Sequence, residues 1–144
     1  MTASSDRLLR RTLWANAALS VVSGLIIAAF GGPFAAAATR GPVTVAGVDL
    51  AVVFELLGIG FVAFGALCAW VASRGVLPRA WARGIFAADL AWVIGSALVL
   101  TLPGTWTIAG VAGIAVVALV VADLAILEYV GLRRLAADEL RAAN

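Results

Sequence analysis

Carboxylic acids within apolar segments are the residues of this sequence best suited to chemistry. Asp89 lies in the run FAADLAWVIGSALVL (86–100), and Asp123 has the same Ala-Asp-Leu-Ala surroundings. An ionisable side chain inside a bilayer costs at least about 2.5–3.5 kcal/mol, so one that is present usually faces the interior of a bundle and has a function. Each aspartate lies ten residues from an arginine, Arg79 or Arg133. We therefore expect Asp89 and Asp123 to form a pair at similar depth, with at least one carboxyl protonated.

Other polar residues could line the same pocket. The spacing i, i+4, i+7 predicts one polar stripe on the first helix, formed by Asn16, Ser20 and Ser23. On the helix of Asp89, Trp92 and Ser96 follow at i+3 and i+7. These residues and the two aspartates are the candidate ligand-binding or proton-titrating set. The alternative is that they are only hydrogen-bond partners that hold membrane helices together.

Two further acids have different expected positions. Glu55 comes soon after the start of its helix and is reachable from outside, beside Asp49, so structural and functional interpretations are both open. Glu128 is five residues from Asp123, which is about 140° around a helix, so the two cannot face one pocket. Because Arg133 is close to Glu128 in sequence, we expect Glu128 to reach the cytoplasmic interface.

The composition predicts the fold class that must position these groups. The chain has 144 residues, of which 64% are hydrophobic and 12% charged, with a mean hydropathy of +1.10. Runs long enough to cross a bilayer, which takes about 20 helical residues, occur at about 12–31, 49–73, 80–102 and 106–132. We predict an all-α protein with a single domain, 1–144, which is an integral membrane bundle of four antiparallel helices.

The arginines predict the orientation of this bundle. Nine arginines fall in three groups: three precede the first span, three lie within 74–83 around the connection between the second and third spans, and three follow the fourth span. Arg40, between the first and second spans, is the one arginine on the opposite side of the membrane. The positive-inside rule then places both termini in the cytoplasm, and we expect a bacterial inner membrane. The first span is longer than a signal-peptide core, so we expect it to be retained. The outer connection 32–48 could form a small hairpin or a cap over the bundle.

Several function classes are excluded by residue content. There is no histidine and one cysteine, Cys68, so we expect no metal, no haem and no other cofactor. Neither a Ser/His/Asp nor a Cys/His set exists for hydrolysis. No catalytic residue is assigned, and we do not expect a nucleic-acid-binding protein; a protein without enzymatic activity is favoured, and an enzyme stays an open alternative.

The second and third spans resemble a known group. The segments LLGIGFVAFGALCAWVASR and DLAWVIGSALVL are similar to small bacterial DoxX-like membrane proteins over about residues 50–134. The resemblance implies a compact antiparallel bundle, in some members linked to redox or quinone-associated partners.

Three functions are compatible with these observations. The first is binding of a small apolar or cationic ligand in the inner half of the bundle, with possible proton-coupled transport, for which a homo-oligomer is expected. The second is a non-catalytic accessory or structural subunit of a larger membrane complex. The third is a membrane lipid isomerase that uses a protonated carboxyl as general acid.

Overall fold

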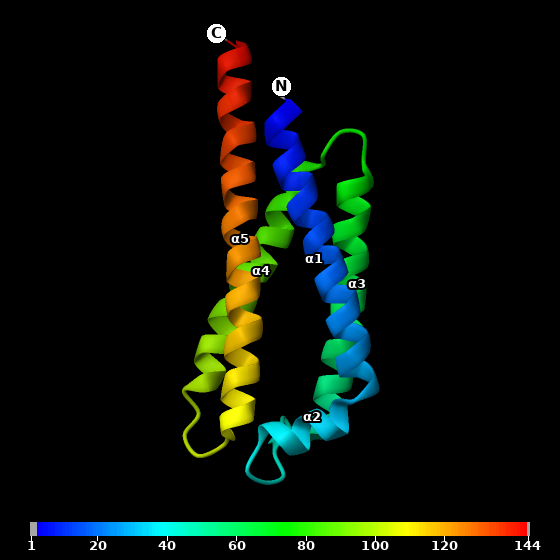
Figure 1. Cartoon of the computed structure of the whole chain (residues 1–144), viewed down its shortest axis with the longest axis vertical. Coiled ribbons are helices and arrows are strands. Elements are labelled where there is room, and N and C mark those ends of the chain that lie inside the picture. Colours follow the sequence, from blue (N-terminus) through cyan, green and yellow to red (C-terminus); the bar gives the residue numbers. More distant parts are fainter. Residues whose placement is uncertain (1–2, 144) are drawn as a thin grey trace.

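The chain folds into helices with one small hairpin. The computed structural model describes residues 3–143, and its elements are α1 (Ala3–Ala29), α2 (Gly31–Ala38), β1 (Thr44–Val45), β2 (Val48–Asp49), α3 (Leu50–Ser73), α4 (Arg79–Leu100) and α5 (Ile108–Ala143) (Figure 1). Four of these helices, all except α2, are long and apolar enough to cross a membrane. The prediction of an all-α chain with four such helices is confirmed.

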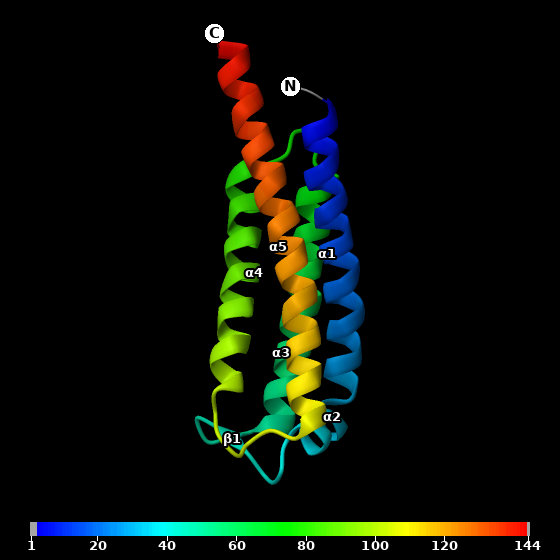
Figure 2. The same cartoon turned by 60° about the vertical axis from the view of Figure 1, so that its left-hand side comes forward.

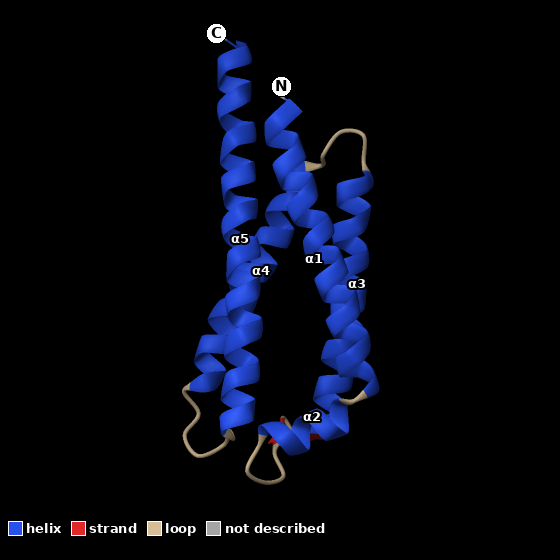
Figure 3. Ribbon diagram, in the orientation of Figure 1, coloured by secondary structure: helices blue, strands red, loops and turns tan. Residues whose placement is uncertain are grey.

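The long helices form two close pairs, α1 with α3 and α4 with α5. The pairs meet where α1 contacts α5, near the two chain termini, and diverge toward the other end (Figure 1). Both termini and the connection between α3 and α4 lie at one end, which we call the terminal end. At the opposite end, which we call the α2 end, lie α2, the hairpin and the connection between α4 and α5. The ribbon coloured by secondary structure shows the two short strands beside α2 (Figure 3).

Glycines allow the close contact between α1 and α3. A Cβ built on Gly58 would overlap the backbone of α1 at Ala28, and one on Gly24 would lie 2.7 Å from the Gly58 carbonyl oxygen. Gly65 similarly faces the Ala17 carbonyl oxygen, at 2.8 Å from its built Cβ. Gly60 instead faces open space. Backbone contact of this kind is how small residues strengthen helix packing in apolar surroundings.

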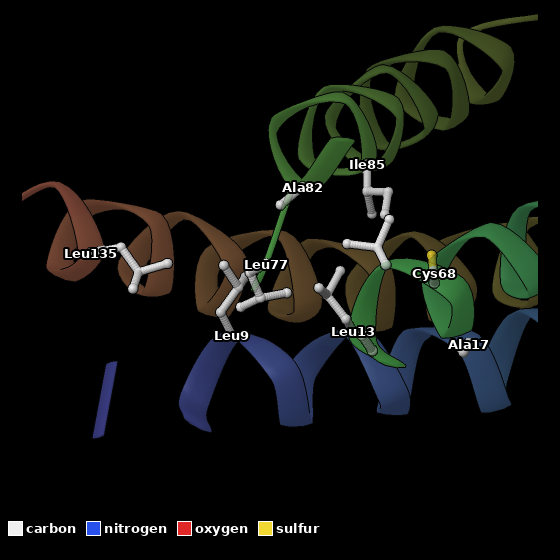
Figure 4. Close-up of a cluster of buried hydrophobic side chains, with 10 residues drawn as sticks. Leu9, Leu13, Ala17, Cys68, Leu77, Ala82, Ile85 and Leu135 are labelled. Carbon is white, nitrogen blue, oxygen red and sulfur yellow. The ribbon is translucent and has the colours of Figure 1, made fainter. Parts of the chain in front are cut away.

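The apolar core lies toward the terminal end. Figure 4 shows its side chains converging from all four long helices and from Leu77, in the connection before α4. Its members include Leu9, Leu13, Cys68, Ile85 and Leu135, each at most 3% exposed. By contrast, large apolar side chains near the α2 end of α1 and α5 are exposed, among them Leu25 at 57% and Val116 at 60%.

The segment 32–48 is more ordered than a loop. A helix, α2, replaces much of the predicted connection, because Pro33 is tolerated in a first helical turn and four alanines follow it. Of the two alternatives for this segment, the small hairpin is present, and it turns through Ala46 and Gly47, whose φ values are 52° and 82°. Helix α2 joins the two pairs, because the Thr107 hydroxyl donates to the Ala37 carbonyl oxygen at 2.6 Å.

Candidate functional site

The amide of Asn16 connects three helices. Its Nδ2 donates to Asp89 Oδ2 on α4 at 2.6 Å and to Glu128 Oε1 on α5 at 3.1 Å. Its Oδ1 accepts a hydrogen bond from the Ser20 hydroxyl at 3.1 Å. We call Asn16, Ser20, Asp89 and Glu128 the acidic cluster. Asn16 uses both hydrogens of one amide group for two carboxyl groups, so the cluster places two acids around a single neutral donor.

The acidic cluster is almost completely removed from the surface. Glu128 is 0% exposed, Asn16 2% and Asp89 4%. The second carboxyl oxygen of Glu128, Oε2, is buried and has no hydrogen-bond partner among the described residues. A buried polar atom without a partner costs free energy, and a negative charge there costs more. Glu128 is thus the member of the cluster with unused capacity to bind a proton or a donor group.

The buried faces of the helices bring the cluster together. On α1, Leu13, Asn16 and Ser20 follow at spacings of three and four residues. On α4 and α5 the same spacing joins Ile85 to Asp89 and Ala125 to Glu128. Each polar side chain therefore occupies a position on the inward stripe of its helix, one turn from a buried apolar neighbour.

The surroundings of the cluster differ between its two sides. Toward the terminal end it adjoins the core shown in Figure 4, because Leu13 and Ile85, fully or almost fully buried, lie one turn before Asn16 and Asp89 on their helices. One turn beyond Asp89 on α4 is Trp92, whose ring packs edge-on against Phe61 of α3, with centroids 4.7 Å apart. The indole nitrogen of Trp92 is buried and has no partner among the described residues. A second unused group, this one a donor, thus lies on the side of the α2 end.

The structure does not bring Asp123 to Asp89. Asp123 lies on the exposed face of α5, and the acid that meets Asp89 through Asn16 is Glu128. The prediction that Glu128 reaches the interface is wrong, because this residue is 0% exposed. The predicted angular separation of about 140° between the two acids holds, but α5 turns Glu128 inward and Asp123 outward.

The remaining predicted residues divide between inside and outside. Ser96 is buried at 7% exposure, and Asn16 and Ser20 belong to the cluster. Ser23 is only partly buried and donates to the Leu19 carbonyl oxygen of its own helix at 2.6 Å. Glu55 is exposed near the start of α3, away from the cluster, and its Cγ lies 2.7 Å from a Cβ built on Gly31.

A sequence pattern could have identified Glu128. Asn16 is five residues from Arg11, Asp89 six from Arg83, and Glu128 five from Arg133. The three residues therefore have matching depths when each is measured from its nearest arginine. If the depth of Asp89 is measured from Arg79 instead, the residue of matching depth on α5 is Asp123, which lies on the wrong face of that helix.

Side chains of the metal-binding types do not converge here. Among the described residues, no three His, Cys, Asp or Glu side chains are placed to hold one metal ion. Comparisons of the chain with protein-family models, with curated proteins and with solved structures gave no match. The resemblance to the DoxX-like group stays a prediction.

Proposed function

We propose that the chain is a four-span membrane protein that binds a small apolar or cationic molecule at the acidic cluster, with a proton exchanged at Asp89 and Glu128. The single observation that carries this proposal is the fully buried Glu128 carboxyl, which has one unpartnered oxygen beside a second acid. Buried acids in membrane helices commonly mark ion, proton or substrate sites. The proposal extends to transport of this molecule across the membrane. Transport would need a homo-oligomer, because four helices rarely enclose a complete pathway.

Membrane insertion in a defined direction is part of the proposal. It is supported by four helices of sufficient length and mean hydropathy, and by large apolar side chains exposed along all of them, among them Val22, Leu56, Leu98 and Leu119. The connection after α3, which carries Arg74, lies at the same end as both termini, and Arg40 lies near the α2 end, bonded through its Nε to the Trp106 carbonyl oxygen. The positive-inside rule then puts the terminal end in the cytoplasm, and we propose the bacterial inner membrane as its location.

The chemistry of the cluster favours a cation or a proton over an anion. Two carboxyl groups with one neutral amide between them have more acceptor oxygens than donor hydrogens. A bound proton supplies the missing donor and removes a buried negative charge. A ligand cation offsets the same negative charge, and the ring of Trp92, one turn from Asp89, and the ring of Phe61 packed against it attract cations through their faces.

The experiment uses tetraphenylphosphonium, a lipophilic cation, as the probe. Binding to purified protein in mild detergent is measured by calorimetry for the wild type, Glu128→Gln and Asp123→Asn. Asp123→Asn is the matched control, because it removes a carboxyl of the same helix that faces outward. We expect the wild type and Asp123→Asn to bind equally and Glu128→Gln to lose binding. Proton release on binding, recorded in weakly buffered solution, should disappear with Glu128→Gln.

Two outcomes would contradict this function. Equal binding by all three proteins would place the cation elsewhere, for example in the detergent. Loss of binding in Asp123→Asn but not in Glu128→Gln would assign the site to the outer face of α5.

A second function is favoured by one observation, that Asn16 bonds to two other helices at once. Such bonds hold membrane helices together, as expected for an accessory subunit whose acids have only a structural role. This alternative predicts that Asp89→Asn and Glu128→Gln lower the thermal midpoint of the protein while the activity of its complex is unchanged.

A further inference from the structure

The face of α5 opposite the acidic cluster has a regular pattern. A series of residues at alternating spacings of four and three, which is the heptad spacing of coiled coils, lies on this face, and all of them are exposed except Val130, which is half-buried. The series is Ala112, Val116, Leu119, Asp123, Ile126, Val130, Arg133, Ala137 and Leu140. We call it the α5 seam. Its large apolar members Val116, Leu119, Ile126 and Leu140 are 60%, 67%, 59% and 70% exposed.

Asp123 is the one carboxyl group in this seam. It lies midway along the candidate membrane span Ile108–Asp138 of α5, and its side chain is exposed. A charged or polar group that faces hydrocarbon at the centre of a bilayer is costly. Lipid can cover the apolar residues of the seam, but lipid tails offer Asp123 no hydrogen bond.

The seam also continues beyond the rest of the bundle. Helix α5 reaches Ala143, and its last turns extend past the other helices at the terminal end (Figures 1 and 2). Leu140, 70% exposed, lies on this extension and in register with the seam. The heptad pattern continues from the membrane-spanning part of α5 into this extension. A partner helix can pack along both parts, whereas lipid can cover only the first.

A second copy of the chain matches these features. Two copies inserted in the same direction bring α5 against α5 in parallel, and a two-fold axis then brings each seam residue opposite itself. Asp123 would meet Asp123, and a carboxyl pair that holds a proton both donates and accepts. Arg133 lies farther along the seam than Asp123, toward the terminal end, and its guanidinium is held over the Tyr129 ring at 5.7 Å from the centroid.

We infer that the protein forms a parallel homodimer through the α5 seam, with the two Asp123 carboxyl groups hydrogen-bonded to each other near the membrane centre. A single polar residue at a core position of a heptad pattern fixes register and oligomeric state. The dimer rests on the proposed membrane insertion but not on the ligand site, which lies on the opposite face of α5.

Cysteine cross-linking in native membranes tests the geometry. In a Cys68→Ala background, which removes the one native cysteine, Leu119→Cys and Ile126→Cys are each oxidised with copper phenanthroline. The control is Ile94→Cys, because Ile94 on α4 is 52% exposed but lies off the seam. We expect a disulfide-linked dimer at positions 119 and 126 and none at 94. Mixed Leu119→Cys and Ile126→Cys chains should not link, because parallel register separates them by about 10 Å.

The role of Asp123 is tested by dilution in lipid vesicles, with dimer measured by energy transfer between labelled chains. We expect Asp123→Leu to raise the dimer dissociation constant about 3- to 30-fold, the usual range for one interhelical hydrogen bond, and Asp123→Asn to retain association. Four results would overturn the inference: a monomer at all densities, links at 94 instead of the seam, a linked product with a different protein, or unchanged association of Asp123→Leu. Tetraphenylphosphonium binding by the same variants shows separately whether the ligand site is intact.

Discussion

Replacement of Asn16 by leucine should be among the most destabilising single changes in this protein. One amide bonds to Asp89 at 2.6 Å and to Glu128 at 3.1 Å, so Asn16→Leu leaves two buried carboxyl groups without a donor. A hydrogen bond to a charged group contributes about 1.5–3 kcal/mol, and Asn16→Leu removes two bonds to carboxyl groups. We therefore expect the free energy of unfolding to fall by about 3–6 kcal/mol.

Equilibrium unfolding in mixed micelles, with increasing dodecyl sulfate and circular dichroism as the readout, measures this loss. Ser23→Ala is the control, because the Ser23 hydroxyl bonds only to the backbone of its own helix. The triple variant Asn16→Leu, Asp89→Leu, Glu128→Leu removes the amide and both carboxyl groups of the acidic cluster. Proteins in which a buried charged network is replaced by apolar residues are often as stable as the original. We expect the triple variant to be more stable than Asn16→Leu alone. An Asn16→Leu protein as stable as Ser23→Ala would refute the reasoning.

Three further changes test other parts of the fold. Gly58→Ala should disrupt the packing of α1 on α3, because the new Cβ would overlap the Ala28 backbone. Gly60→Ala is the control, because Gly60 faces open space. The thermal midpoint should fall for Gly58→Ala and stay unchanged for Gly60→Ala. Thr107→Ala should cost about 1–2 kcal/mol, measured by micelle unfolding, because Thr107 accepts from the Gly110 amide at 3.0 Å as a helix cap and also bonds to α2. Arg10→Leu should loosen the end of α3, because Arg10 donates to the carbonyl oxygens of Ala72, Arg74 and Gly75; faster proteolysis near residue 75 measures this, with exposed Arg11→Leu as control.

The four long helices were predictable because composition alone defines them. A continuous apolar run satisfies its own backbone hydrogen bonds only as a helix in an apolar environment, and glycine or proline separates the runs. Helix α2 was not predicted, because Gly31, Gly32 and Pro33 are residues that rarely continue a helix. For the segment 32–48 the sequence predicts a connection with a hairpin or a cap. Proline lacks only a donor that the first turn does not use, so the four following alanines extend a helix there.

The members of the candidate site were predicted better than their pairing. Asn16, Ser20 and Asp89 follow from helical periodicity, because each lies on the inward stripe of its own helix. The choice between Asp123 and Glu128 depends on the rotation of α5 about its axis. An apolar helix with branched side chains all round has no strong amphipathic pattern to fix that rotation.

Close packing fixes the rotation of α5. A Cβ built on Gly131 would lie 3.0 Å from the Leu9 Cβ, so this glycine allows α1 to approach α5 on one face only. Glu128 is three residues before Gly131 and therefore shares that inward face, while Asp123 is directed outward. The same contact thus assigns one acid to the cluster inside the chain and the other to the α5 seam. Because the two acids are on opposite faces of one helix, we expect substitution of Glu128 to change the proposed ligand binding alone and substitution of Asp123 to change the inferred self-association alone.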